Sequence, residues 1–320
     1  MTRDRRRDDR SSRRSERATR SDGGYEVVDG GSETVPGGHE VAVGAARSAD
    51  SGSALGQLYV VAETEYRLAV RSRWAVAVTA LFAAFALGLT TFSGSDASPA
   101  GFERIVASLA VLAVYLVPLV ALAFSYDAVV GREESGWLQA LFALPVSRTR
   151  VVLGTAVGRA VVLASATILG FGIAGALLLL EYGFDGFESY VGFLLGTVGL
   201  GLAFLSLGVL ASTLAREKTH ALGLALLAWA WFVLVHDLLA LGVIAAFAPP
   251  DAAVTAMVLS NPTGVFRALA LGALGASGDA GFAAVLTEAG LSTGALVAAL
   301  VAWIVVPIAL AGAAIRRRRL

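Results

Sequence analysis

The sequence predicts an all-α membrane protein with six transmembrane helices, and three observations support this prediction. Hydrophobic residues make up 56% of the 320 residues and charged residues only 16%, so the chain cannot cover a water-soluble globule with charge. Its apolar runs are continuous rather than alternating every second residue, which favours helices over barrel strands. Six of these runs approach or exceed the roughly 20 residues that a helix needs to cross about 30 Å of hydrocarbon.

The first 56 residues differ in composition from the rest. They are rich in Arg, Asp, Ser and Gly, with acidic residues interleaved among the basic ones. Such a segment cannot bury enough surface to fold, so we expect a disordered tail over 1–56 and a six-span membrane domain over 57–320. The interleaved acids weaken a nucleic-acid interpretation of the Arg clusters, and no nucleic-acid partner is expected. An apolar run is missing from this tail, so no cleavable signal peptide is expected there.

An amphipathic segment precedes the first span. In "LYVVAETEYRLAVRSRW", Glu63, Arg67 and Arg71 lie off an apolar stripe at helical spacing. The stripe consists of Leu58, Val61, Ala62, Leu68 and Ala69. This pattern predicts an interfacial helix over 57–73 that lies along the membrane lipid of the inner leaflet.

The six predicted spans divide the basic residues unequally. The spans are Trp74–Phe92, Ile105–Phe124, Ala160–Leu180, Tyr190–Leu214, His220–Phe247 and Gly294–Ile315. Outside the tail, only Arg104 and Arg267 lie on one side. The other side carries Arg67, Arg71, Arg73, Arg132, Arg148, Arg150, Arg159, Arg216, Lys218 and Arg316 to Arg319. Because basic loops remain inside, both termini are expected to be cytoplasmic, in the cytoplasmic membrane.

The connection between spans five and six contains the run "NPTGVFRALALGALG". It is too short and too glycine-rich to span, so we expect short re-entrant or interfacial helices there. We predict that this helical segment lies on the external side and caps the pathway. Its candidate residues are Asn261, Pro262, Phe266 and Arg267.

Motifs of enzymatic chemistry are missing from the sequence. It has no GxxxxGK[ST] loop, no HExxH, no GxSxG and no cysteine. We therefore expect no catalytic residue, no metal site and no cofactor on this chain. If ATP and Mg are used, they are expected on a partner subunit.

One pair of ionisable residues lies within an apolar run. His236 and Asp237 are about 24 Å from the cytoplasmic end of the fifth run, near the outer surface. Two interpretations stay open, namely a pair that snorkels to the outer headgroups and a contact with substrate in the pathway. A lone His in a chain with two Met makes a poor copper site. An intramembrane enzyme would have only this pair to offer.

A polar island, Ser125–Arg150, separates the second and third runs. After Gly136 it predicts a helix with an apolar face, which ends at Pro145. Glu133 and Glu134 lie at its start, where the helix dipole favours acids. The face consists of Trp137, Leu138, Leu141 and Phe142. The helix either lies on the inner leaflet or is presented to a cytoplasmic protein, and acids beside an exposed Trp are unfavourable against anionic lipid.

The island resembles a known family. "DAVVGREESGWLQALFALPVSRTRVVLGTAVGR" is similar to the D-x-I-x-x-E-R-E-x-G-T-L-E-x-L-L-x-x-P-V-S-R-x-x-V-V-L-G-K stretch of type 2 ABC-transporter permeases, especially the NosY-like permeases of the nitrous-oxide reductase maturation cluster. "AETEYRLAVRSRWAVAVTALFAAF" resembles their E-L-R-x-x-x-R-x-R-W entry into span one, and "LSNPTGVFRALAL" resembles their external L-N-P-x-x-x-F-R-x-L segment. The likeness runs from Ala62 to the C-terminus and leaves the tail unmatched.

The resemblance implies that the loop between spans two and three carries a cytoplasmic coupling helix that docks into an ABC ATPase subunit. The residues that match the family's stretch are Asp127, Arg132, Glu133, Glu134, Gly136, Leu138, Leu141, Pro145, Ser147, Arg148 and Gly154. Trp137 is predicted to join this contact. The family's usual Thr, Glu and Lys are replaced here by Trp137, Gln139 and Thr155.

The expected function is that of a permease subunit, homodimeric and coupled to a separate ATPase, rather than of an enzyme. The NosY-like resemblance implies a copper- or sulfur-related cargo. A drug or lipid exporter fits the same spans. The alternative class is a membrane scaffold or maturation factor that recruits a cytoplasmic partner without transporting anything.

Overall fold

The computed structural model describes residues 54–71, 73–92, 99–135, 147–184, 186–247, 249–274 and 291–317, all within the unit Gly52–Leu320. In these ranges the chain consists of helices and short connections without a strand, so the predicted all-α class is confirmed. Six helical stretches are long and apolar enough to cross a membrane, as predicted, and the chain is a multi-pass membrane protein. They are α3 (Trp74–Phe92), α4 (Pro99–Ser125) continued by α5 (Val130–Glu134), α7 (Arg148–Tyr182), α8 (Phe187–Leu214), the α9 to α10 run (Lys218–Phe247) and α14 (Thr293–Arg317).

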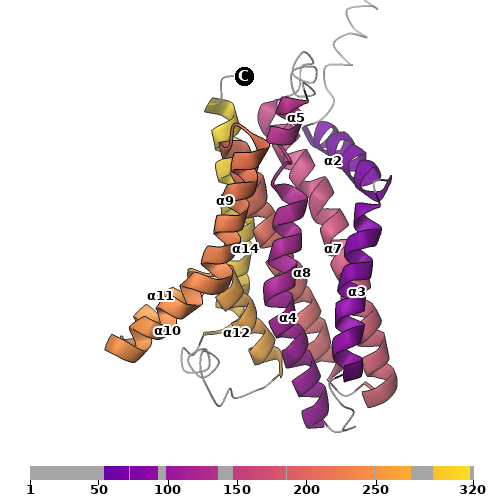
Figure 1. Ribbon diagram of the computed structural model, residues 1–320, viewed down its shortest axis with the longest axis vertical. Helices are drawn as coiled ribbons and strands as arrows, with labels where there is room; N and C mark the ends of the chain where they lie inside the picture. Colours follow the sequence, from indigo (N-terminus) through magenta and orange to yellow (C-terminus); the bar gives the residue numbers. More distant parts are fainter. Residues whose placement is uncertain are drawn as a thin grey trace, which may run out of the picture. The chain divides into compact units, whose positions relative to one another are not determined.

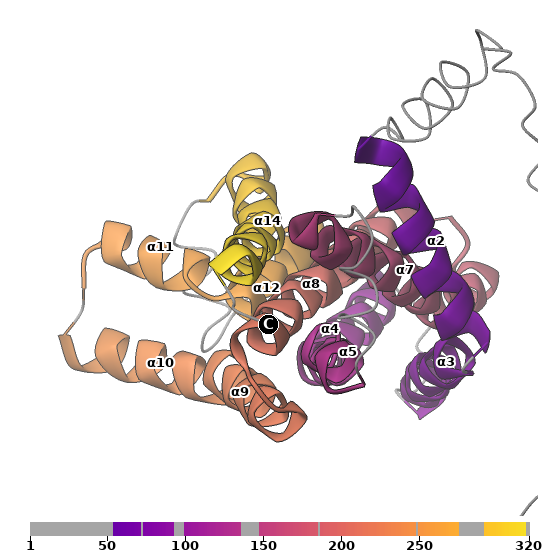
Figure 2. The same ribbon diagram turned by 90° about the horizontal axis from the view of Figure 1, so that it is seen from above.

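Helix α8 lies at the centre of the bundle (Figure 2) and packs against α4, α7, α12 (Pro262–Leu274) and α14. Phenylalanine side chains fill the core between these helices. The ring centroid of Phe193 in α8 lies 5.8 Å from that of Phe171 in α7 and 6.3 Å from that of Phe266 in α12. All three rings are fully buried. The core therefore joins the predicted spans to the short helices that precede the last one.

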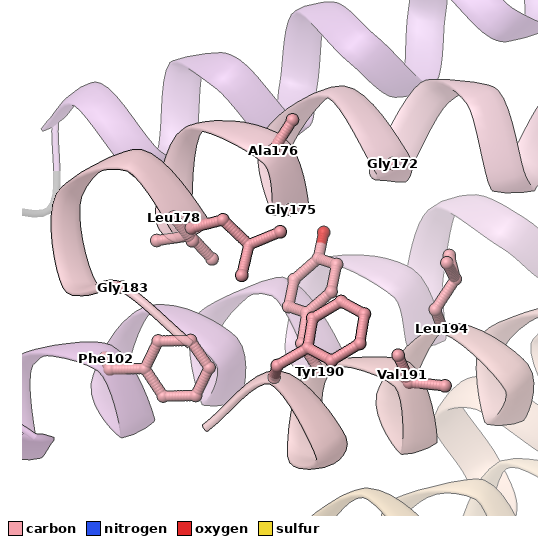
Figure 3. A pocket seen from close by; sticks show the side chains of 11 residues that line it. Phe102, Gly172, Gly175, Ala176, Leu178, Gly183, Tyr190, Val191 and Leu194 are labelled. Atoms are coloured by element: carbon pink, nitrogen blue, oxygen red, sulfur yellow. The ribbon is translucent and has the colours of Figure 1, made fainter. Parts of the chain in front are cut away.

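Small residues allow close helix contacts in the same region. Tyr190 of α8 lies against Gly175 of α7, where an added Cβ would come within 2.3 Å of the tyrosine ring (Figure 3). The Tyr190 hydroxyl donates to the Phe171 carbonyl oxygen at 2.5 Å, which satisfies a buried polar group. An apolar pocket of about 230 Å³ lies beside this contact, between α7 and α8. Gly175 thus has a packing role that a larger residue could not fill.

Helix α7 begins earlier than predicted. It starts at Arg148 rather than at Ala160, with Ser147 as an N-cap whose hydroxyl accepts from the Arg150 backbone N–H. The start of the apolar run did not mark the start of the helix, because three arginines lower the hydropathy of this stretch without interrupting the helix. Its 35 residues correspond to about 52 Å, longer than the hydrocarbon core. The first turns of α7 therefore extend beyond the membrane interior.

The amphipathic helix before the first span is present as α2 (Ala54–Arg71), close to the predicted 57–73. It packs obliquely on α7 (Figure 1). The helix begins three residues before the predicted interfacial segment. The remaining tail, 1–53, lies outside the described residues.

The fifth span changes geometry along its length. α9 (Lys218–Ala230) runs into a five-residue π-helical turn, η1 (Trp231–Val235), and continues as α10 (His236–Phe247). The chain returns through α11 (Asp251–Leu259), which meets α12 at a bend of 106°. In Figures 1 and 2, α10 and α11 extend away from the central helices. A bent apolar pair of this kind is either a broken span or a re-entrant loop, and short helices were predicted for this connection.

Candidate functional site

The first part of the polar island forms α5 (Val130–Glu134), which is hydrogen-bonded to the end of α8. The backbone N–H groups of Val129 and Val130 donate to the Ser212 hydroxyl at 2.9 and 3.1 Å. The N-cap residue Val129 cannot supply such an acceptor, so Ser212 caps α5 from another helix. Gly208, one turn earlier, lies so close to Ser125 that an added Cβ would overlap its hydroxyl.

A charged network joins α5 to α2 and α7. Glu65 of α2 is 6% exposed and pairs with Arg132 of α5. Arg132 also donates to the Thr155 hydroxyl of α7 at 2.7 Å. Arg159 of α7 lies between two carboxylates, 2.8 Å from Asp127 Oδ1 and 3.9 Å from Glu65 Oε2. Charges buried to this extent need such partners, because an unpaired one would be strongly destabilising.

The backbones of α2 and α7 lie close together, which brings Glu65 of α2 within reach of the charged side chains around α7. An added Cβ at Gly158 would come within 2.4 Å of Glu65 Cβ and 2.6 Å of the Ala62 carbonyl oxygen. Arg159 also donates to the carbonyl oxygen of Phe124, and its guanidinium carbon lies 5.4 Å from that ring centroid. Glu65, Phe124 and Arg159 border a pocket of about 510 Å³. α2 is therefore tied to the bundle by charge and by close backbone packing.

The other end of α5 is tied to the fifth span. Glu134 Oε1 accepts from the backbone N–H of Lys218 at 2.8 Å, and Glu134 Oε2 lies 3.9 Å from Lys218 Nζ. Glu217, the N-cap of α9, supplies no side-chain cap, so Glu134 takes that role. Through Arg132, Ser212 and Glu134, the short helix α5 contacts α2, α7, α8 and α9 within one turn.

The basic residues assigned to one side of the membrane lie together in the structure. α5, the first turns of α7 and α9, and the last turns of α8 and α14 meet at one end of the bundle (Figure 1). The hydrogen bond from Thr149 of α7 to the Gly312 carbonyl oxygen of α14, at 3.3 Å, is one of their direct links. Arg148 belongs to this end, at the first residue of α7. Gly136, Trp137, Leu138, Leu141 and Pro145 lie outside the described residues.

A second polar cluster lies at the junction of η1, α10 and α12. A π-helical turn withdraws carbonyl groups from regular helical bonding. Here the Phe232 carbonyl oxygen accepts from Asn261 Nδ2 at 2.9 Å and from the Thr263 hydroxyl at 3.0 Å. The Asn261 side-chain oxygen accepts in turn from the Thr263 backbone N–H at 3.0 Å. Asn261 thus fixes the bend before α12 to the irregular turn of the fifth span.

Asp237 completes this cluster. It is 9% exposed, accepts from Asn261 Nδ2 at 3.0 Å and pairs with Arg267 of α12. His236 lies beside it, with Nδ1 3.1 Å from Asn261 Nδ2 and Nε2 3.1 Å from the Ser260 hydroxyl. The Asn261 amide nitrogen thus lies within hydrogen-bond distance of three groups, namely the Phe232 carbonyl oxygen, Asp237 Oδ1 and His236 Nδ1.

The structure brings together residues that the sequence suggested separately. His236 and Asp237 contact Asn261 and lie next to Arg267, while Pro262 begins α12. A snorkelling Asp237 would point its carboxylate into solvent, whereas the structure buries it against Arg267. The pair is therefore part of an internal network that fixes α12, and the headgroup interpretation is not supported.

Sequence reasoning missed Glu65, Arg159 and Ser212. Glu65 could have been found, because it falls in register with the apolar stripe of α2, and an acid in such a stripe needs a buried partner. Arg159 was counted only as a topological charge. Ser212 carried no signal, because it lies inside the predicted span Tyr190–Leu214.

The comparisons with known proteins agree with this architecture. Residues 59–319 match the sequence profile of the family described as "ABC-2 family transporter protein". The chain belongs to this family. It is 36% identical over 274 residues to a Stutzerimonas stutzeri protein named "Probable ABC transporter permease protein NosY", covering 82% of this chain and 99% of the relative. The protein of the same name from Pseudomonas aeruginosa is 35% identical over 274 residues, covering 82% of this chain and 98% of the relative.

Family membership decides the class of function. This ABC-2 chain is a membrane permease subunit of an ATP-binding-cassette transporter, as the resemblance implied. The described residues include no group of three His, Cys, Asp or Glu side chains placed to hold a metal ion.

Proposed function

We propose that this permease works as a homodimer with two copies of a separate ATPase, which binds ATP and Mg, in the cytoplasmic membrane. Both termini and the segment Ser125–Arg150 would face the cytoplasm. The observation that carries the proposal is the attachment of α5 to four helices within one turn. A force applied to the loop that follows Glu134 would reach spans two to five and α2 together.

Coupling then requires two states of the bundle that bind the ATPase differently. The predicted helix over Gly136–Pro145 would dock into the ATPase, with Trp137 as an anchor. The network of Glu65, Arg132 and Arg159 would keep its base rigid. The cluster of Asp237, Asn261 and Arg267 would hold α12 as an external cap of the pathway.

The cargo is proposed from likeness. Both curated relatives carry the name NosY, and the NosY-like resemblance leads us to propose a copper- or sulfur-related cargo connected with nitrous-oxide reductase maturation. The test is transport into inverted vesicles that contain the chain and its ATPase partner. ATP-dependent uptake of a copper or sulfur species supports this cargo, whereas uptake of a drug or lipid alone supports an exporter.

Coupling is tested separately with Trp137→Ala. If Trp137 fills a pocket of the ATPase, the variant should lose about 2 kcal/mol or more of binding, so that pull-down of the ATPase and permease-stimulated ATP turnover both fall. Trp231→Ala is the matched control, because Trp231 is 48% exposed on the fifth span, away from α5. Normal ATPase binding in vesicles that transport nothing would favour a scaffold that recruits a partner without transport.

A further inference from the structure

An apolar groove that the transport interpretation does not use lies between α7, α8 and α14. Its volume is about 520 Å³. Most of its walls are Leu, Ile, Val and Ala side chains, and its polar side chains are Thr149, Ser206 and Arg316. Val157 and Val305 border it and are 42% and 55% exposed, so the groove opens sideways from the bundle. In a membrane-spanning region, that opening faces hydrocarbon.

The dimensions of the groove match one leaflet. Along α14 it runs from Ile304 to Arg316, which is about 18 Å at 1.5 Å per residue. Half of a bilayer's hydrocarbon core is about 15 Å thick. The Arg316 end coincides with the end of α14 and the first turn of α7, where Thr149 contacts Gly312. The groove thus begins where a span ends and finishes near mid-membrane.

The charge at its mouth is positive. Arg316 Nε donates to the Gly312 carbonyl oxygen at 3.3 Å, and within the described ranges this is the contact found for its guanidinium. Arg317 follows on the same helix, and Arg148 and Arg150 lie in the first turn of α7. Basic pockets between membrane helices at the level of the headgroups are suited to anionic lipid headgroups.

We propose that this groove binds an anionic phospholipid, with one acyl chain between α7, α8 and α14 and the phosphate at Arg316. Water does not fill a groove lined by aliphatic side chains. A second copy is disfavoured, because a two-fold contact through this face would bring the arginine-bearing ends of two α14 helices together. A phospholipid satisfies both halves of the groove at once, since its phosphate is anionic and its chain is apolar.

Lipid binding is tested with the full purified chain in neutral detergent. Dioleoyl-phosphatidylglycerol and dioleoyl-phosphatidylcholine, which share their acyl chains, are titrated separately. The midpoint of thermal unfolding rises with the concentration of a ligand that binds the folded state, so each titration gives an affinity. Native mass spectrometry of the same samples counts bound lipid. No ATPase is present, so the result is independent of the proposed transport function.

Single variants distinguish a specific lipid-binding site from general electrostatic attraction between lipid and the basic surface. Arg316→Gln should weaken phosphatidylglycerol binding about five-fold, as expected for one lost cation near a phosphate, and Arg316→Lys should restore most of it. Arg317→Gln is the matched control and should change the affinity less than about two-fold. Ala160→Phe, inside the groove, should reduce the bound lipid, whereas Val161→Phe, 50% exposed beside the groove, should not.

Three results would overturn the proposal. Equal affinity of the wild-type chain for the two lipids would remove the preference for an anionic headgroup, because both lipids carry a phosphate and only phosphatidylglycerol has a net negative charge. Equal effects of Arg316→Gln and Arg317→Gln would indicate general surface charge. Efficient disulfide formation between two chains carrying Val305→Cys, in membranes rich in phosphatidylglycerol, would show that a second copy covers the groove.

Discussion

Glu65 on α2 and Arg132 on α5 form an ion pair that connects the amphipathic N-terminal helix to the first turn of the polar island. The side chains are 7% and 15% exposed, and Arg159 lies within ion-pair distance of the same carboxylate. The guanidinium groups of Arg132 and Arg159 therefore share the Glu65 carboxylate as an ion-pair partner. This relationship makes Glu65 the residue whose loss should disturb the region most.

Glu65→Gln should lower the free energy of unfolding by about 3 kcal/mol, because it leaves two buried guanidinium groups with less compensation. The matched control is Glu63→Gln on the same helix. Glu63 pairs with Arg67 at 2.5 Å, but these side chains are 36% and 71% exposed, so an effect below about 0.5 kcal/mol is expected. Denaturation in detergent measures both variants, and equal effects would show that the network is not stabilising.

Arg267→Ala should destabilise the packing of α12, because it leaves the buried Asp237 carboxylate without its cation. The cost should be about 3 kcal/mol for the single variant, and the double variant Arg267→Ala/Asp237→Asn should recover part of it. Thermal unfolding and vesicle transport are measured for the two single variants and the double variant. If Arg267→Ala changes neither transport nor stability, the segment is only a connector.

Gly158→Ala should weaken the contact between α2 and α7, because the new Cβ would come within 2.4 Å of Glu65 Cβ and 2.6 Å of a backbone oxygen. Overpacking of this kind costs about 1–3 kcal/mol. Gly172→Ala is the control on the same helix, since a Cβ there meets nothing within 4 Å. It should be neutral or stabilising, because alanine favours helix by about 1 kcal/mol over glycine. A stable Gly158→Ala variant would mean that α2 can move without cost.

The orientation of the chain can be tested by single-cysteine labelling, because the sequence contains no native cysteine. Ser135→Cys, exposed at the end of α5, should resist a membrane-impermeant maleimide in intact cells and react after the membrane is opened. Ser277→Cys, between spans five and six, should react in intact cells. The reverse pattern would invert the topology and move α5 to the outside.

The spans were predictable from the sequence because hydropathy depends on composition alone. Helix ends were not, since Arg148, Arg150 and Arg159 lower the hydropathy of a stretch without ending the helix α7. The contacts of α5 come from helices that are distant in the sequence. Ser212 and Lys218 reach α5 only after the bundle has formed, and no local pattern carries that information.

The second cluster shows the same limit. His236, Asp237, Asn261 and Arg267 were all selected from the sequence, yet as two separate features. Their meeting depends on the 106° bend before α12, which the Asn261-Pro262 turn signal marks, and on a π-helical turn, which has no sequence signature here. An acid inside an apolar run predicts that a partner exists without identifying it.

The π-helical turn Trp231–Val235 also sets the rotational phase of everything after it. An α-helix turns by about 100° per residue, so one residue accommodated in the wider turn rotates the faces of α10 by about that amount relative to α9. In an uninterrupted α-helix, the Asp237 carboxylate would point toward a different azimuth from Arg267 and Asn261. The fifth span therefore carries two helical faces in different phase, one that packs against α4 and α8 and one that holds the buried acid.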